Sequence, residues 1–291
     1  MQGDDIRDRS RIEHADIIAL NFIRPHPPYI FRPHFRSGLR SRILEMLSPD
    51  AVEREQGGVM VDGLRRFPRA RPIKMLRIFR RRFRDLGDAL EETRRLKIVE
   101  GHLGPDFIAR SSEFYVEYRC GRQRQILLCG LQDYISGVAL DPWQADGAGY
   151  IDGLERRLRG TAPNGAPVVF RDRLLDQVAQ FTACIRSMMD ADGLIPDLAG
   201  ARNLLVTGDA RVCLVDINNI HPVFFGPQVP LDDKGYPVMD RSIEALERLG
   251  RHLLGCSILA ADDAYRIFFS PVRRRRVQEC QARFCQMTTF R

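Results

Sequence analysis

The chain has 291 residues, of which 44% are hydrophobic and 29% charged, a balance typical of a folded globular protein with one large or two smaller domains. No apolar run is long enough for a transmembrane helix, and the polar N-terminus lacks a signal-peptide pattern. Seven scattered cysteines without a Cys-x-x-Cys pair argue against a disulfide framework and a structural zinc site, and favour a cytoplasmic protein.

The formal net charge is +7, and almost all of the positive charge belongs to arginine, because lysine occurs only at positions 74, 97 and 234. Arginine could supply positive charge at any position, so a lysine in this chain suggests that a compact ammonium group is needed where it stands. The alternative is codon bias that leaves a few lysines without special roles.

Prolines between residues 25 and 33 exclude a long helix in that part of the first 50 residues, which we predict to form an N-terminal extension. Ser41 to Leu47 is predicted as a short helix. Gly57 and Gly58 then precede a short predicted strand. Bare glycine backbone can approach a phosphate closely, so this pair is a candidate nucleotide-binding loop, although it matches neither G-x-G-x-x-G nor the Walker motif.

Arg71 to Ile78 is predicted as a strand that carries Lys74, and Asp85 to Leu103 as the helix that follows it. Glu92 falls on the apolar stripe of this helix. A carboxylate that faces a core is costly unless it is paired, so we predict an ion pair between Lys74 and Glu92. The alternative is that Glu92 lies at the margin of the stripe and pairs with a nearby arginine.

Phe107 to Tyr118 and Gln125 to Leu131 are predicted as two further strands that complete a small antiparallel sheet. Residues 132–137 then leave the sheet in a turn at Gly137. Arg171 to Met189 is predicted as a long helix that leads directly into the most informative stretch of the chain, with an apolar inner face formed by Leu174, Val178, Phe181, Ile185 and Met188. Farther along, Arg241 to Leu254 is predicted as a helix that Asp240 caps, with Ile243, Leu246, Leu249 and Leu253 facing inward.

Residues 194–219 predict a loop, a two-stranded hairpin and a second loop. Asp197 lies in the first loop, Asn203 at the start of the first strand, and Asp216 just after the second strand. A hairpin brings its ends together, and carboxylate and amide oxygens are the ligands that Mg²⁺ prefers. The stretch therefore predicts a site for a magnesium–nucleotide complex, although a surface hairpin with ordinary polar turn residues remains the alternative.

Over about residues 55–255 this order of elements resembles the protein-kinase-like superfamily, in particular its atypical bacterial kinases and its aminoglycoside-phosphotransferase-like members. Asp197 matches the catalytic aspartate of H-R-D-x-x-x-x-N, Asn203 matches the metal-binding asparagine, and Asp216 matches the aspartate of D-F-G. Other parts of those motifs differ, because Ile195-Pro196 stands in place of His-Arg and the interval from Asp197 to Asn203 is one residue longer.

The resemblance implies an α+β, bilobal protein-kinase-like fold. Residues 51–134 would form an N-lobe with a small antiparallel sheet and helix C. Residues 135–291 would form a mainly helical C-lobe that contains the catalytic hairpin and ends in a basic tail.

The resemblance also implies binding of ATP. Lys74, held by Glu92, would orient the α- and β-phosphates, and the two adjacent glycines at 57 and 58 would cover them. Backbone groups at Asp133 and Ile135 would bind the adenine where the chain passes between the lobes.

The implied reaction is Mg²⁺-dependent transfer of the γ-phosphate to a hydroxyl group of an unidentified acceptor. Asn203 and Asp216 would hold Mg²⁺, and Asp197 would accept the proton of the attacking hydroxyl. Because the H-R-D arginine and an A-P-E motif are absent, a small molecule, sugar or lipid is favoured over a protein as the acceptor.

Two other functions remain open. The altered motifs are also compatible with a kinase-like pseudoenzyme that binds nucleotide or acts as a scaffold. Arginine-rich runs at residues 77–84 and 273–276 could instead contact nucleic acid or an anionic membrane surface, but such runs are more often solvated, so we do not favour this function.

Overall fold

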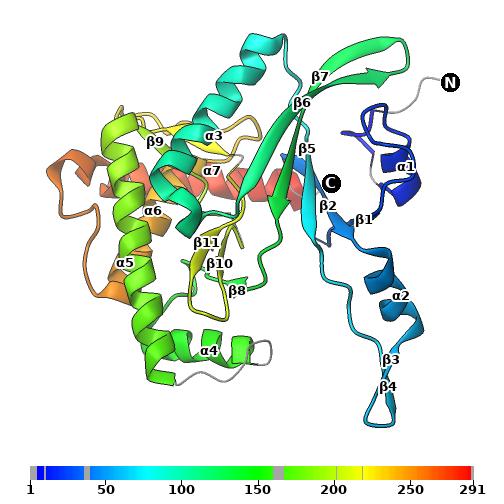
Figure 1. Cartoon of the computed structure of the whole chain (residues 1–291). Coiled ribbons are helices and arrows are strands. Elements are labelled where there is room, and N and C mark those ends of the chain that lie inside the picture. The colour runs from blue at the N-terminus through cyan, green and yellow to red at the C-terminus, as the bar shows by residue number, and fades with distance from the viewer. Residues whose placement is uncertain are drawn as a thin grey trace. The chain divides into compact units, whose positions relative to one another are not determined.

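The computed structural model describes residues 5–9, 11–35, 40–159, 167–200, 202–217 and 219–289 (Figure 1). The protein is of mixed α+β type, with antiparallel sheets and several helices. It divides into two compact units, one formed by residues 1–94 and 109–134, the other by residues 95–108 and 135–291. Within the described ranges no helix has the length and apolar character needed to cross a lipid bilayer.

The first unit is built on a five-stranded antiparallel sheet in the order β1-β2-β5-β7-β6. Its strands are β1 (Ile30–Pro33), β2 (Ser41–Leu47), β5 (Lys74–Phe79), β6 (Ser111–Cys120) and β7 (Gln123–Asp133). The three strands predicted between residues 71 and 131 are confirmed. The helix predicted from Ser41 to Leu47 is wrong, because this segment pairs with β1 on one side and β5 on the other, and tertiary pairing overrides a weak local preference.

The N-terminal residues form part of the core of this unit. Ile6, Ile12, Ile17 and Leu20 are buried together with apolar residues of the sheet, and α1 (His14–Ile18) carries Ile17. The backbone N–H of Ile6 also donates to the hydroxyl of Tyr118, 3.0 Å away. The first 50 residues therefore supply both β1 and β2 and a layer of the core.

A helix and a small hairpin separate β2 from β5. Helix α2 (Pro49–Gly57) begins with the hydroxyl of Ser48 accepting from the backbone of Ala51, and it ends at Gly58, whose φ of 72° favours glycine. Strands β3 (Val59–Val61) and β4 (Leu64–Arg66) follow, and their turn points away from the five-stranded sheet (Figure 1).

Helix α3 (Leu86–Phe107) confirms the helix predicted from residue 85. The residues predicted to form its apolar stripe are all buried: Ala89, Leu96, Val99 and Leu103. The helix kinks at Gly104, which has a φ of 54° and precedes Pro105. The division between the two units falls within α3.

The second unit contains most of the helices. They are α4 (Gly147–Arg159), α5 (Pro167–Asp192), α6 (Val238–Leu249), the short helices η1 (Gly250–Leu254) and η2 (Asp263–Phe269), and α7 (Pro271–Thr289). The predicted inner face of α5 is confirmed, since its five members are fully buried: Leu174, Val178, Phe181, Ile185 and Met188. The predicted inner face of α6 is buried in the same way, through Ile243, Leu246 and Leu249.

Two small antiparallel sheets accompany these helices. One has the order β11-β10-β8 and consists of β8 (Val138–Ala139), β10 (Leu204–Val206) and β11 (Val212–Leu214). The other pairs β9 (Leu194–Pro196) with β12 (Ile220–Pro222). The predicted hairpin is thus confirmed as β10–β11, whereas the β9–β12 pair was not predicted from the sequence.

An ion pair between Asp240 and Arg273 joins α6 to α7. Asp240 was predicted to cap α6, but the helix already begins at Val238, and the carboxylate accepts from Arg273 Nε at 2.5 Å and Nη2 at 3.2 Å. Arg273 also donates to the carbonyl groups of Phe224 and Gly226. This arginine of the predicted solvated tail is therefore buried, with 3% of its side chain exposed.

Replacing Arg273 with alanine should lower the free energy of unfolding by about 3–5 kcal/mol, because it leaves the Asp240 carboxylate buried without its charge partner. Chemical denaturation measures this loss. The matched control is Arg275→Ala, which removes an exposed arginine from the same helix. Equal effects of the two substitutions would contradict the structural role of the ion pair.

Candidate functional site

Asp197 joins the two small sheets of the second unit through its backbone. Its N–H donates to the carbonyl of Asn219 at 2.8 Å, next to β12. Its own carbonyl accepts from Asn203 Nδ2 at 2.9 Å, at the start of the β10–β11 hairpin. The loop after β9 is therefore fixed between the two strand pairs.

The carboxylate of Asp197 is held by three donors. Oδ1 accepts from the backbone N–H groups of Ala199 at 3.0 Å and Gly200 at 2.9 Å, and Oδ2 accepts from Asn219 Nδ2 at 3.3 Å. Burial raises the pKa of Asp197, and the charge of Asp216 raises it further, while these hydrogen bonds act in the opposite direction. The carboxylates of Asp197 and Asp216 therefore interact electrostatically in a partly desolvated environment.

Asn203 has a fixed orientation. Its side chain is buried, and because Nδ2 donates to the carbonyl of Asp197, Oδ1 is directed elsewhere. The backbone carbonyl of Asn203 accepts from Val215 at 2.9 Å, so pairing of the hairpin continues to the residue before Asp216. The structure therefore brings Asp197, Asn203 and Asp216 into one neighbourhood.

The donor set of this neighbourhood is suited to a hard cation. Asp216 offers carboxylate oxygens and Asn203 an amide oxygen, and Mg²⁺ is commonly held by one or two such groups together with water. In the described part of the chain no cluster of three or more His, Cys, Asp or Glu side chains has metal-binding geometry. Asp216 and Asn203 could therefore hold a single magnesium ion together with water, and they do not form a cage of protein ligands.

Two polar members of the site, Asn219 and His221, were not predicted as functional residues from the sequence. Asn219 bonds Asp197 through both its backbone and its side chain, and its Oδ1 lies 2.6 Å from His221 Nε2. Both residues depend on the pairing of β12 with β9, and strands of three residues leave no periodic pattern in the sequence. The adjacent Asn-Asn after Asp216 was the only available signal.

The loop from Asp197 to Gly200 is anchored on its outer side. The N–H of Leu198 donates to Ser242 Oγ of α6 at 3.0 Å, and the indole N–H of Trp143 donates to the carbonyl of Ala199 at 3.4 Å. The guanidinium of Arg241 stacks 3.8 Å from the centroid of the same indole ring. Helix α6 and the only tryptophan therefore hold the loop in place.

In the first unit, Lys74 and Glu92 have different partners from those predicted. The Lys74 ammonium donates to the carboxylate of Asp133, which is its directly opposite neighbour on β7. Glu92 accepts from Arg81 at 2.6 Å. The predicted Lys74–Glu92 pair is therefore wrong, and Glu92 follows the alternative, a glutamate at the margin of the stripe that pairs with a nearby arginine.

The other predicted nucleotide contacts have structural roles of their own. Gly58 ends α2 with a φ of 72°, and Gly57 is the last residue of that helix. The backbone N–H of Asp133 donates to the carbonyl of Arg110 at 2.8 Å, so this group is already used. Ile135 is half-buried and is the first residue of the segment that continues the second unit.

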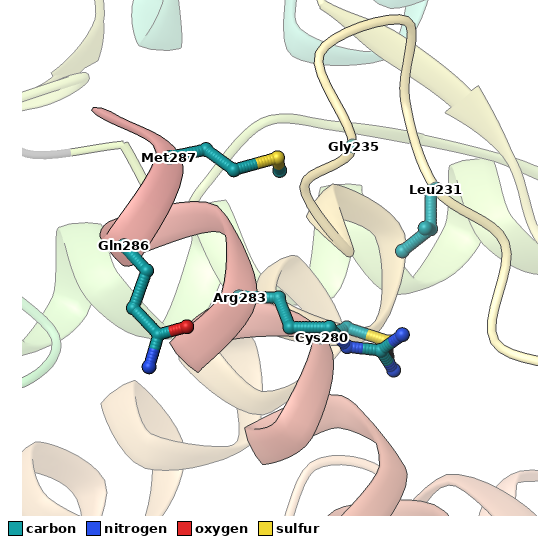
Figure 2. A pocket seen from close by; sticks show the side chains of 6 residues that line it. All are labelled: Leu231, Gly235, Cys280, Arg283, Gln286 and Met287. Atoms are coloured by element: carbon teal, nitrogen blue, oxygen red, sulfur yellow. Dashed lines mark hydrogen bonds between the residues drawn. The ribbon is translucent and has the colours of Figure 1, made fainter. Parts of the chain in front are cut away.

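A pocket of about 480 Å³ opens between α7 and the loop that precedes α6 (Figure 2). It is lined by Leu231, Gly235, Cys280, Arg283, Gln286 and Met287. The same loop continues to Tyr236, whose ring centroid lies 5.0 Å from that of Phe284 on α7. Burial raises the pKa of Tyr236, and the charge of Asp197 contributes in the same direction against the opposing effect of Arg241. The loop that lines the pocket therefore also carries Tyr236, whose pKa is affected by the charge of Asp197.

No protein-family model matches the chain, and no curated protein matches it in sequence. The geometry and chemistry of the described residues are therefore the basis for assigning a function.

Replacing Asp197 with asparagine tests the burial of its charge. A raised pKa means that the folded state binds the proton more tightly than the unfolded state, so the parent loses stability relative to Asp197→Asn as the pH rises above about 4. Denaturation curves from pH 3 to pH 8 measure this difference. A parent that becomes more stable than the variant over this range contradicts the assigned environment.

Gly200→Ala tests how closely the loop and Asn203 must approach each other. A Cβ atom at residue 200 would lie 2.3 Å from Asn203 Nδ2, so the amide must move, and we expect a loss of about 1–3 kcal/mol in the free energy of unfolding. The matched control, Gly153→Ala, lies in α4 with open space around the new methyl group and should be stabilising by about 0.5–1 kcal/mol. If Gly200→Ala and Gly153→Ala shift the denaturation midpoint in the same direction, the close packing of Gly200 against Asn203 is contradicted.

Proposed function

We propose that this protein is a Mg-ATP-dependent phosphotransferase of bilobal, protein-kinase-like fold, which transfers the γ-phosphate to a hydroxyl group. The observation that carries the proposal is the convergence of Asp197, Asn203 and Asp216 at the ends of the β10–β11 hairpin. Two mutually repelling carboxylates beside an oriented amide are the groups that such a transfer requires.

Asn203 and Asp216 would hold the magnesium ion, and the ion would neutralise charge on the phosphates. The raised pKa of Asp197 supports this assignment, since burial and the charge of Asp216 both disfavour a second negative charge. A bound cation next to Asp216 relieves this repulsion. The nearby carboxylates would then both be ionised at neutral pH.

Asp197 would act as the base. The backbone N–H groups of Ala199 and Gly200 orient its carboxylate by donating to Oδ1. The acceptor oxygen would form a bond to the γ-phosphorus while the bond from that phosphorus to the bridging oxygen breaks. ADP leaves with the electron pair, and the hydroxyl proton passes to Asp197.

In the first unit, Lys74 would supply a positive charge to the nucleotide phosphates. The proposal assigns Asp133, and not Glu92, as the carboxylate that holds this ammonium. The backbone N–H of Asp133 already donates to the carbonyl of Arg110, so the backbone of Ile135 is the group proposed to bind the adenine. Gly57 and Gly58 end α2 and are not assigned to the phosphates.

A small molecule is the proposed class of acceptor. The 480 Å³ pocket beside α7 (Figure 2) is within the size range of small-molecule sites. Tyr236 follows Gly235 of its lining, and the charge of Asp197 contributes to the raised pKa of this tyrosine. A mass-spectrometric screen of metabolite mixtures with ATP would identify the acceptor by a mass gain of one phosphoryl group.

Asp216→Ala should reduce phosphoryl transfer by about a thousandfold, because the phosphates lose charge neutralisation, while the fold is kept. The rate of ADP formation with the identified acceptor measures the loss. Asp209→Ala, which removes an exposed aspartate from the turn of the same hairpin, is the matched control and should keep the parental rate. An Asp216→Ala variant that keeps the parental rate would contradict the assignment of Asp216 as a magnesium ligand.

A nucleotide-binding pseudoenzyme is the second candidate. It is favoured by the observed pairing of Lys74 with Asp133 and of Glu92 with Arg81, which differs from the pairing of active kinases implied by the resemblance. Mg-ATP that raises the melting temperature without any turnover would support this second function.

A further inference from the structure

The β3–β4 hairpin of the first unit is an exposed element with an unusual surface. Its turn, Asp62-Gly63, has positive φ at both residues, 52° and 76°, as in a tight type I′ hairpin. The apolar side chains around this turn are solvent-exposed, with 62% of Met60, 65% of Leu64 and 61% of Phe67 accessible. Nothing in the described part of the chain buries them.

Apolar side chains lie on both faces of the hairpin. Directly opposite residues of an antiparallel pair share a face, so Val61 and Leu64 lie on one face, whereas Met60 lies on the other, opposite Arg65. A flat protein surface could cover only one of these faces. A medium that surrounds the turn could cover both.

Arginines follow the apolar turn immediately. Arg65, Arg66, Arg69 and Arg71 lie within seven residues of Leu64, and Asp62 is the only acidic residue between Gly57 and Ile73. Arg69 contacts Glu45 at 3.3 Å. Among the residues that the structure describes, no ion pair is found for the arginines at 65, 66 and 71, so their charge faces solvent.

We propose that the β3–β4 hairpin inserts its turn into the surface of an anionic lipid bilayer. Leu64 and Met60 would enter the boundary of the acyl chains, and the arginines would meet the phosphate groups of the lipids. Arg66 is two residues behind Leu64 along β4, about 7 Å at the rise of a strand, which matches the depth of interfacial insertion.

Nucleic acid is the less suitable partner for this hairpin. Bases stack on aromatic rings, and the turn carries methionine, valine and leucine, with Phe67 as the only nearby aromatic side chain. Aliphatic side chains gain little from a base but gain transfer free energy from hydrocarbon. The composition of the turn therefore favours lipid.

Sedimentation of the full chain with vesicles tests the proposal. The parent should bind vesicles of phosphatidylcholine mixed with phosphatidylserine, bind pure phosphatidylcholine vesicles weakly, and release as salt is raised. Met60→Ser with Leu64→Ser should weaken binding by about tenfold or more, since two buried apolar side chains are lost. Arg65→Gln with Arg66→Gln should weaken binding to the anionic vesicles by about tenfold.

Matched controls separate the hairpin from general surface effects. Leu90→Ser removes an exposed apolar side chain from α3, and Arg84→Gln with Arg122→Gln removes two exposed arginines elsewhere in the same unit. Both controls should bind as the parent does. Circular dichroism and melting curves establish that every variant is folded.

Fluorescence provides an independent readout. The parent contains one tryptophan, so the emission of Leu64→Trp minus that of the parent reports the turn, and it should shift to shorter wavelength only with anionic vesicles. The proposal is overturned by a parent that does not bind anionic vesicles, by hairpin variants that bind as well as the parent, or by an unshifted difference spectrum. Binding to RNA or DNA in place of vesicles overturns it as well.

Discussion

The second unit depends on the way in which a single residue, Asp197, is bonded. Its backbone joins the β9–β12 pair to the β10–β11 hairpin, and its carboxylate accepts from two backbone N–H groups of its own loop. These bonds therefore hold the β9–β12 pair, the β10–β11 hairpin and the loop after β9 in a single arrangement, although each of these segments is short and has little stability of its own. Asn203 and Asn219 are oriented by the same bonds, so the polar groups of the site are set by the fold before any ligand arrives.

The electrostatic surroundings of Asp197 differ from those of Asp240, which is buried on α6. The guanidinium of Arg273 neutralises Asp240, and the pair connects α6 to α7. Asp197 has amide donors and a second carboxylate, Asp216, as its electrostatic neighbour. Burial raises the pKa of both aspartates, but the guanidinium of Arg273 opposes the shift at Asp240, whereas the charge of Asp216 adds to it at Asp197. Carboxylates perturbed by burial together with a like charge concentrate at functional sites. The contrast separates a structural aspartate from a candidate functional one within the same helical unit.

The features that could be predicted correctly from the sequence depend on patterns among residues close together in the chain. The inner faces of α5 and α6 follow helical periodicity, and the β10–β11 hairpin follows from two apolar runs around a Gly-Asp turn. The proximity of Asn203 and Asp216 follows from the hairpin itself. These features could be predicted because each depends on residues close together in the chain.

Predictions failed where the partner is distant in the chain. Lys74 pairs with Asp133 because β5 and β7 lie in register, and no helical pattern around Glu92 reveals that register. Ser41 to Leu47 forms a strand because β1 and β5 flank it. Asn219 joins the site through strands too short to leave a periodic pattern in the sequence. Asp240 was taken for a cap because its partner, Arg273, lies on another helix.

Electron paramagnetic resonance of Mn²⁺, in the presence of a non-hydrolysable ATP analogue, tests whether Asp216 holds a cation. We expect a tightly bound Mn²⁺ ion in the parent that is lost in Asp216→Asn, a substitution that preserves the shape of the side chain while removing its charge. Unchanged stoichiometry and affinity in a folded Asp216→Asn variant would contradict the claim that this hairpin forms a cation–nucleotide site.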